Sequence, residues 1–131
     1  MSLEVHLVTP EREVWSGTAQ MLIAHGVDGE VGILAGHAPL LVRLSIGVLR
    51  LQTEDGDWQR AVIDGGFLHV TSAGGATRVD VLATGAEMAA DVDRAAAGAR
   101  AVELEAELGH GQDDTIRTEL EKARVRTRLD G

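Results

Sequence analysis

The first two thirds of the chain, up to about residue 85, alternate short apolar runs with glycine-containing turns. The runs are rich in β-branched residues and occupy residues 3–8, 18–24, 48–53, 60–63, 67–71 and 78–83. The turns between them contain the pairs Asp28-Gly29, Asp55-Gly56, Gly65-Gly66 and Gly74-Gly75. Such pairs adopt the positive φ angles that tight hairpin turns require. The pattern therefore predicts an antiparallel β-sandwich or barrel over residues 1–86.

From Glu87 onward the chain consists mainly of helix-forming residues and contains no proline. We expect two helices, over residues 91–108 and 115–129, joined by Gly109-His110-Gly111. Asp113 or Asp114 is placed to cap the second helix. The first helix has two apolar stripes at helical spacing. One is Val92, Ala95, Ala99, Val102 and Ala106, and the other is Ala97, Ala101, Leu104 and Leu108. Because these stripes are rich in alanine, they bury little area, and residues 87–131 should form a weakly held helical hairpin.

The composition excludes several classes of function. The 131 residues include 21 Asp and Glu against 12 Lys and Arg, which gives a formal net charge of −9. Aromatic side chains are limited to Trp15, Trp58 and Phe67. An acidic chain with few stacking groups is a poor partner for nucleic acid. Because the chain has no cysteine, it has no disulfide, thiolate metal site or cysteine nucleophile.

The sequence predicts no membrane-spanning segment. The most apolar stretch, residues 33–51, is interrupted by His37, Pro39, Arg43 and Arg50, whereas a spanning helix needs about 20 mostly apolar residues. Residues 1–6 lack the basic start and apolar run of an export signal. We expect a chain that stays where it is made and reaches a membrane only through a partner.

Charge is divided between the two predicted helices. Residues 86–114 carry eight acidic residues against Arg94 and Arg100, whereas residues 115–131 carry five basic residues against three acidic ones. One interpretation is ordinary: cations are favoured near a helix C-terminus, and both helices have solvated faces. The other is that the basic helix rests on its acidic neighbour in one state and on a different acidic surface in another.

Three segments carry a resemblance that extends over essentially the whole chain. Residues 29–40 read GEVGILAGHAPL, residues 46–49 read IGVL and residues 64–70 read DGGFLHV. In this order, and followed by two alanine-rich helices, they resemble the epsilon-subunit family of the F-type ATP synthase. The resemblance implies a β-sandwich of about ten strands followed by a two-helix antiparallel hairpin. It also implies a non-catalytic subunit of the central stalk that requires no cofactor.

The resemblance implies partners as well. Family members join the gamma subunit to the membrane-embedded ring of c subunits, so the chain is expected at the cytoplasmic face of the cell membrane, held there by the complex. Glu30 is expected to face the c ring, and Gly36, His37, Ala38 and Pro39 to contact the stalk. Without the resemblance, Glu30 is an ordinary exposed carboxylate. A metal or catalytic role for His37, with His25 twelve residues earlier, is disfavoured, because no third ligand beyond Asp28 and no Ser or Cys nucleophile on a recognisable turn is patterned nearby.

Residues 91–95, Asp-Val-Asp-Arg-Ala, match most of a family motif, Ile/Leu-Asp-x-x-Arg-Ala, through which some bacterial members bind ATP. The apolar first position is Ala90 here. The resemblance makes Asp91, Arg94 and Ala95 candidate contacts for ATP as a regulatory ligand. Arg100 and Arg117 are further candidates for its phosphates. In the structural alternative, Asp91 caps the first helix and pairs with Arg94.

Many family members restrain ATP hydrolysis through their C-terminal helices. Here the expected inhibitory helix carries Arg117, Lys122, Arg124, Arg126 and Arg128. When the hairpin opens, these side chains would meet acidic segments of the alpha/beta catalytic head. The alternative function is an unrelated β-sandwich protein-binding module with a helical tail, which would show no affinity for gamma. An enzyme would need convergent polar groups in a pocket, and the sequence patterns none.

Overall fold

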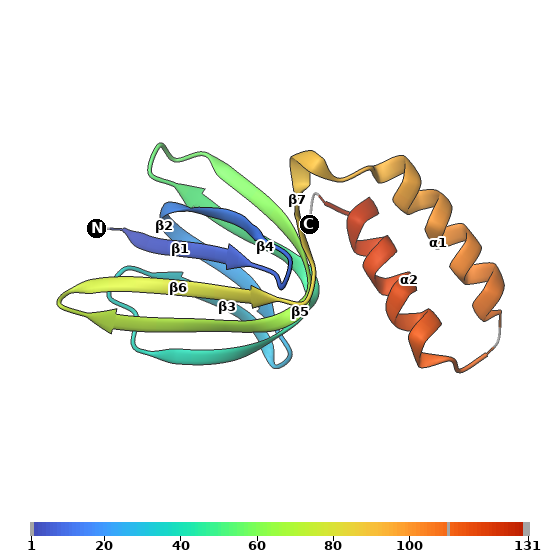
Figure 1. Ribbon diagram of the computed structural model, residues 1–131, viewed down its shortest axis with the longest axis horizontal. Coiled ribbons are helices and arrows are strands. Elements are labelled where there is room, and N and C mark those ends of the chain that lie inside the picture. The colour runs from blue at the N-terminus through green and yellow to red at the C-terminus, as the bar shows by residue number, and fades with distance from the viewer. Residues whose placement is uncertain (1, 110, 130–131) are drawn as a thin grey trace.

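A computed structural model describes residues 2–109 and 111–129. The expectations for residues 1, 110, 130 and 131, including the middle of the predicted interhelical turn, lie outside the described residues. Figure 1 shows a strand-built body, coloured blue to yellow, with a helical hairpin, orange to red, at one end. The strands are β1 (Leu3–Val8), β2 (Glu13–Gly26), β3 (Gly29–Leu34), β4 (Leu40–Thr53), β5 (Trp58–Ala73), β6 (Ala76–Ala83) and β7 (Ala86–Met88).

The strands form a mixed sheet in the order β1-β6-β5-β4-β2-β3, with β7 paired to β5. β1 also pairs with β2, so β1, β6, β5, β4 and β2 form a closed circuit. The expectation of a wholly antiparallel sheet was wrong, because β1 and β6 run parallel, with Val5 opposite Val79. A circuit with an odd number of strands cannot be antiparallel at every pairing, so one parallel pair is required.

The described residues form seven strands, and the expected ten was wrong. The difference arises because β2, β4 and β5 are 14, 14 and 16 residues long and continue through bends at which we expected strands to end. Gly65 and Gly66 were expected in a turn, but they lie inside β5 with φ angles of 96° and 134°. A side chain at Gly66 would collide with the backbone oxygen of Leu82. These glycines bend the strand without reversing it.

The core of the sandwich is formed by the inward positions of these strands. Its largest fully buried side chains include Leu3, Val5, Leu7, Leu22, Ile33, Leu49, Leu51, Leu68 and Val70. Burial alternates along β1 and β6, as expected for strands with one buried face. The predicted turns at residues 55–56 and 74–75 are confirmed, since tight turns there join β4 to β5 and β5 to β6.

The helical part begins with a short 3-10 turn, η1 (Ala89–Asp91), followed by α1 (Arg94–Leu108) and α2 (Asp114–Thr127). Asp113 caps α2, as predicted, by accepting hydrogen bonds from the backbone N–H groups of Thr115 and Ile116 at 2.9 and 3.2 Å. The cap of α1 is Asp93, which accepts from the N–H of Ala96 at 2.9 Å. The alternative in which Asp91 caps this helix was wrong, because Asp91 is the last residue of η1 and Asp93 occupies the cap position of α1.

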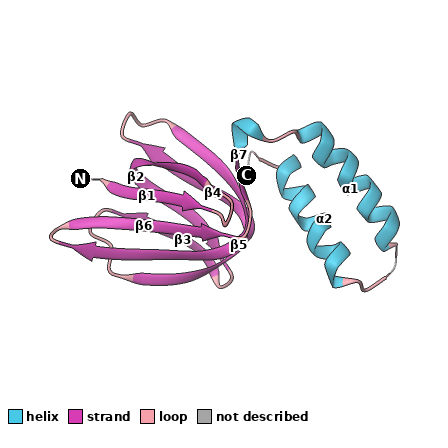
Figure 2. Ribbon diagram, in the orientation of Figure 1, coloured by secondary structure: helices cyan, strands magenta, loops and turns pink. Residues whose placement is uncertain are grey.

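α1 and α2 form the expected hairpin, with α2 between the sandwich and α1 in the view of Figure 2. Only one of the two predicted stripes on α1 is buried. Ala101 and Leu104 pack against Leu120 and Ala123 of α2, and Ala97 of the same stripe is also buried. The other stripe is exposed over most of its length, including Val102. No described helix has the length and apolar character needed to span a membrane.

Candidate functional site

The C-terminal end of α2 is the part of the hairpin that packs on the sandwich. Val125 and Leu129 are buried against Val48 of β4 and Val62 of β5. The partly buried apolar side chains of Ile46, Ala89 and Val92 pack against this cluster. The Nη1 atom of Arg60 donates a 2.7 Å hydrogen bond to the carbonyl oxygen of Leu129. The hairpin is therefore attached to the sandwich near one end of α2.

An ion-pair cluster centred on Arg126 lies beside these apolar contacts. Its Nη1 and Nη2 atoms donate to the two carboxylate oxygens of Asp64 at 2.8 and 2.9 Å, and its Nε donates to Glu87 at 2.7 Å. The side chains of Arg126 and Asp64 are only 16% and 12% exposed. The hydrogen bonds to Asp64, and then those to Glu87, raise the pKa of Arg126 above its ordinary value, although burial acts in the opposite direction.

The other basic residues of α2 have exposed or local partners. Arg124 donates to Glu105 of α1 at 2.8 Å. Lys122 pairs with Glu119 at 3.2 Å, and Arg128 with Glu121 at 3.5 Å, both within α2. Arg117 donates to the side-chain oxygen of Gln112 at 3.3 Å. The five predicted basic residues thus differ in their contacts: one bridges the helices, one bridges to the sandwich, and three stay on their own segment.

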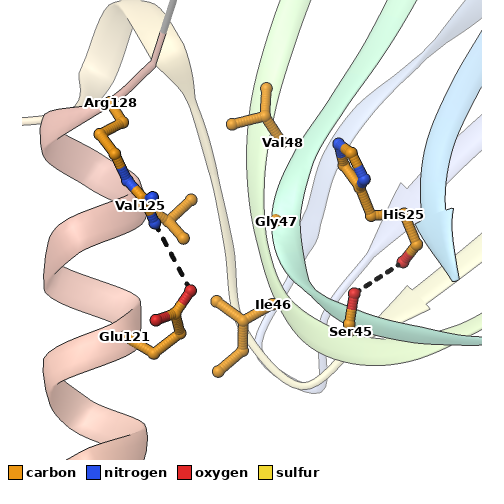
Figure 3. A pocket seen from close by; sticks show the side chains of 8 residues that line it. All are labelled: His25, Ser45, Ile46, Gly47, Val48, Glu121, Val125 and Arg128. Atoms are coloured by element: carbon orange, nitrogen blue, oxygen red, sulfur yellow. Dashed lines mark hydrogen bonds and ion pairs between the residues drawn. The ribbon is translucent and has the colours of Figure 1, made fainter. Parts of the chain in front are cut away.

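A groove of about 300 Å³ remains between α2 and the sandwich (Figure 3). It is lined by His25, Ser45, Ile46, Gly47, Val48, Glu121, Val125 and Arg128. Figure 3 shows the Glu121–Arg128 pair on the helical wall and the hydrogen bond from Ser45 to the carbonyl oxygen of His25 on the opposite wall. The contact between the hairpin and the sandwich is therefore incompletely packed.

A second feature is an exposed apolar face on the sandwich, formed by Leu41 of β4, Phe67 of β5 and Leu82 of β6. These side chains are 65%, 48% and 52% exposed. Phe67 lies opposite both Leu82 and Arg43, and Leu41 is two residues from Arg43, so the three apolar side chains share one side of the sheet. Phe67 and Leu82, together with Val8 and Pro10, line a groove of about 380 Å³. Exposed apolar patches of this kind commonly mark protein contacts.

Sequence reasoning missed this apolar face, although a signal was present. A strand with one buried face alternates apolar and polar residues. In this chain Phe67 precedes buried Leu68, and Leu82 follows buried Val81. Two adjacent apolar residues in a strand place one side chain in the core and the other outside, so each pair predicts an outward apolar position.

The structure does not bring the predicted ring-contact and stalk-contact residues into one site. Glu30 lies near the start of β3, 3.5 Å from Arg50 and 3.9 Å from His25. The loop of Gly36, His37, Ala38 and Pro39 follows the other end of β3. It is tied to the sandwich by hydrogen bonds from the N–H of Gly36 to Thr77 at 2.8 Å and from Ser72 to the carbonyl oxygen of His37 at 3.2 Å. The loop leads directly into β4, two residues before Leu41.

The candidate ATP contacts are also spread out. Asp91 is in η1, while Arg94 and Ala95 begin α1. Arg117 is in the first turn of α2, at the other end of the hairpin, and α1 alone is about 22 Å long at 1.5 Å per residue. Arg94 lines a groove with Trp15 and Trp58, whereas Arg100 pairs with Glu103 and lines a different groove beside Lys122. With the hairpin in this position, these five residues do not surround one ligand.

Metal binding has no candidate in the part of the chain that the structure describes. Within residues 2–109 and 111–129, no three His, Asp or Glu side chains are grouped closely enough to hold a metal ion. His37 directs its Nδ1 atom to the carbonyl oxygen of Ala38 at 2.7 Å.

Comparisons with known proteins agree on one family. Residues 2–89 match the family model described as "ATP synthase, Delta/Epsilon chain, beta-sandwich domain". The ATP synthase epsilon chain of Thermobifida fusca is 45% identical, covering 96% of this chain and 90% of that relative. The chloroplastic ATP synthase epsilon chain of Guillardia theta is 35% identical, with 96% and 95% covered.

A solved structure also resembles the full chain. A chain of the Euglena gracilis mitochondrial ATP synthase, in a structure of its OSCP, F1 and c-ring, superposes with a TM-score of 0.84 at 21% sequence identity. The likeness covers 99% of this chain and 82% of that one. At this level of identity it supports the fold, with the hairpin included.

Proposed function

This chain belongs to the epsilon-chain family of the ATP synthase, and from that premise we propose that it couples rotation of the c ring to the gamma shaft while its hairpin regulates ATP hydrolysis. An epsilon chain is a structural and regulatory subunit of the central stalk and is not itself catalytic. The proposal places the chain at the cytoplasmic face of the membrane, held there by the complex.

The observation that carries the coupling proposal is the exposed apolar face of Leu41, Phe67 and Leu82. A rotor subunit needs a large and lasting contact with the shaft, and lasting contacts bury apolar and aromatic side chains at their centre. Arg43 lies beside Phe67 in the register of the sheet and supplies a polar neighbour. We assign this face, together with the adjoining loop of residues 36–39, to the contact with gamma.

Binding of purified gamma to variants of this chain tests the assignment. Phe67→Ser should weaken binding at least tenfold, because it removes an aromatic side chain from the proposed centre of the contact. Val27→Ser is a matched control, since Val27 is also exposed but lies in the turn between β2 and β3. Equal affinity of the Phe67→Ser variant and the unchanged chain would reject this face as the docking surface.

Contact with the c ring is proposed for Glu30, which is exposed and whose ion pairs are long, 3.5 Å to Arg50 and 3.9 Å to His25. Since exposed pairs of this length contribute little, the carboxylate is available for a basic partner. Glu30→Lys should weaken binding to isolated c rings. Asp28→Lys makes the same charge change two residues away and serves as the control. Equal losses from both changes would show a general charge effect and no role specific to Glu30.

Regulation is proposed to require release of the hairpin, after which Arg117, Lys122, Arg124, Arg126 and Arg128 contact acidic segments of the alpha/beta head. A truncation should keep β7, because Glu87 pairs with Val62 in the sheet. Deletion of residues 94–131 should therefore leave ATP synthesis largely intact and raise ATP hydrolysis. An unchanged hydrolysis rate in the assembled enzyme would mean that the hairpin does not act as a brake.

ATP as a regulatory ligand is a separate proposal. Arg94 and Ala95 begin α1, three residues after Asp91 in η1, and a helix N-terminus favours phosphate. Contacts from Arg100 and Arg117 to the same ATP would require a different arrangement of the hairpin. Calorimetry with ATP should detect binding that Arg94→Ala weakens and that Arg12→Ala, a change at an exposed residue in the sandwich, leaves unaltered. No heat from the unchanged chain would exclude ATP as a ligand.

A further inference from the structure

The two carboxylates that contact Arg126 are supplied by firmly held parts of the sandwich. The N–H of Asp64 donates to the carbonyl oxygen of Gly85 at 2.9 Å, and Thr84 donates its hydroxyl to the carbonyl oxygen of Asp64 at 2.8 Å. A Cβ atom at Gly85 would lie 2.7 Å from Oδ2 of Asp64, so glycine makes room for this carboxylate. Glu87 is held by the pairing of β7 with β5. The backbone at both acceptors is therefore held within the sandwich, independently of the hairpin.

Arg126 is the one basic residue of α2 with a paired and largely buried contact to the sandwich in the described structure. Its bidentate pair with Asp64 and its bond to Glu87 use all three guanidinium nitrogens, and Nη1 also donates to the carbonyl oxygen of Lys122 at 3.1 Å. Removing one partner from a buried, fully paired ion cluster is strongly destabilising, whereas exposed ion pairs contribute little. The contacts of Arg124 and Arg128 are exposed.

Few other contacts hold the hairpin in place. Val125 of α2 and Leu129, two residues beyond its end, supply the buried apolar contact, and Arg60 donates to the carbonyl oxygen of Leu129. The groove beside Val125 leaves part of the contact unfilled. The buried residues of α1 face α2 and not the sandwich. Release would also leave Asp64 and Glu87 close together without their shared cation, and like charges at short range repel. The ion cluster therefore contributes a large share of the preference for the docked position.

We propose that Arg126, Asp64 and Glu87 form a latch that holds the hairpin on the sandwich in the absence of any nucleotide. The latch sets the fraction of molecules in which the hairpin is released. Its effect on ATP hydrolysis rests on the braking function proposed above, whereas its effect on the position of the hairpin does not. The latch is a property of this chain's own side chains, so it operates in the isolated subunit.

The experiment measures the distance between the sandwich and the hairpin in the isolated, nucleotide-free chain. Because the sequence has no cysteine, spin labels at Asp55→Cys and Glu107→Cys, both exposed positions, attach only where intended. We expect the unlatched variant Arg126→Met to increase the released fraction at least tenfold. Arg124→Met, which removes the exposed pair with Glu105, is the matched control and should leave the distance distribution unchanged.

Two further variants guard against general damage to the fold. Glu87→Gln removes the negative charge of one of the two acceptors without touching the helix, and it should raise the released fraction by less than Arg126→Met does. Adding Asp64→Asn and Glu87→Gln to Arg126→Met removes the two carboxylate charges that the loss of Arg126 leaves unpaired. This triple variant should partly restore docking. Hydrogen exchange in β5 reports whether the sandwich stays folded, and it should match the unchanged chain in every variant.

Three results would overturn the latch. The first is a released hairpin in the unchanged chain without nucleotide. The second is an unchanged distance distribution in Arg126→Met, and the third is release of the hairpin by Arg124→Met to the same extent as by Arg126→Met. A separate assay of the assembled synthase tests the braking function. If Glu87→Gln, which leaves all five basic side chains of residues 115–131 in place, releases the hairpin but ATP hydrolysis does not fall, the latch stands and the brake is rejected.

Discussion

The sandwich and the hairpin bury their apolar residues on very different scales. The sandwich encloses large side chains such as Leu22, Leu51 and Leu68, which are completely buried. The contact between α1 and α2 has Leu104 and Leu120 at its centre, and its other buried positions are the alanines Ala101 and Ala123. Each buried leucine contributes about 1.5–3 kcal/mol, and each alanine considerably less.

This difference shows how one chain combines a rigid part with a part that changes position. The closed circuit of strands distributes the stability of the sandwich over many long-range pairings. The hairpin has one neighbouring helix and one small attachment to the sandwich. Local opening has a low free energy where few apolar contacts are lost. We therefore expect the hairpin to open or leave the sandwich while the sandwich remains folded, and four predictions test this comparison.

The largest effect is expected in the core of the sandwich. Leu68→Ala should lower the free energy of unfolding by about 3–5 kcal/mol, because it creates a cavity in a fully buried position. Urea unfolding followed by the fluorescence of Trp15 and Trp58 measures this change. Leu41→Ala, at an exposed position of the same sheet, is the control and should cost about 0.5 kcal/mol or less. A loss below about 1 kcal/mol for Leu68→Ala would contradict the assigned core.

A smaller and local effect is expected for the centre of the hairpin. Leu104→Ala should lower the free energy of opening of α1 and α2 by about 2–3 kcal/mol. Hydrogen exchange should accelerate in the helices and stay unchanged in β5. Val102→Ala, on the exposed side of α1, is the control. If Leu104→Ala also destabilised the sandwich by the same amount, the two parts would unfold as one unit and the comparison would fail.

The cap of α2 should have a still smaller effect. Asp113→Ala removes the acceptor for two N–H groups and should cost about 1 kcal/mol of helix stability. Hydrogen exchange in the first turn of α2 measures this loss. Thr118→Ala, an exposed change in the same helix, should leave the exchange unchanged or slow it. Unchanged exchange in Asp113→Ala would show that the first turn is already frayed.

The smallest effect concerns the pH dependence of the sandwich. The hydrogen bonds of His6 to Glu13, and then to Glu4, both 3.0 Å, raise its pKa above the ordinary value. Because the folded state holds the proton more tightly, this stabilisation is present below the unfolded pKa of about 6.5 and is lost as the pH rises through the folded pKa. NMR titration should show the raised pKa of His6. The urea midpoint should fall slightly across that range, and less so in His6→Gln.

Features set by neighbouring residues could be predicted from the sequence. Asp113 was identified as a candidate cap because capping depends on the N–H groups of the next residues. The turn at Gly74 and Gly75 was identified because its φ angles are a local property. The same reasoning failed at Gly65 and Gly66, where glycine permits a bend as readily as a reversal. The strands paired with β5 on both sides of these glycines determine that the chain bends there and does not reverse.

The candidate site also combines features that local sequence predicts with contacts that depend on residues far apart in the chain. Asp64 and Arg126 were both noted, one within a motif and the other in the basic helix, but nothing in the sequence pairs residues 62 positions apart. Which of the two stripes on α1 is buried depended on where α2 lies. The outward position of Phe67 was implied by its apolar neighbour, yet its grouping with Leu41 and Leu82 required the register of three strands.

The sequence by itself determined the division into a strand-rich part and a helical part, most of the tight turns, and the family. These depend on local backbone preferences and on motifs that extend over a few residues. Only the tertiary structure decided the parallel pairing of β1 with β6, which closes the circuit of strands. It also decided the grouping of Leu41, Phe67 and Leu82 into one exposed face, and the contact of Arg126 with Asp64 and Glu87. The physical reason is that these features join residues far apart in the chain, and their positions follow from packing the whole molecule.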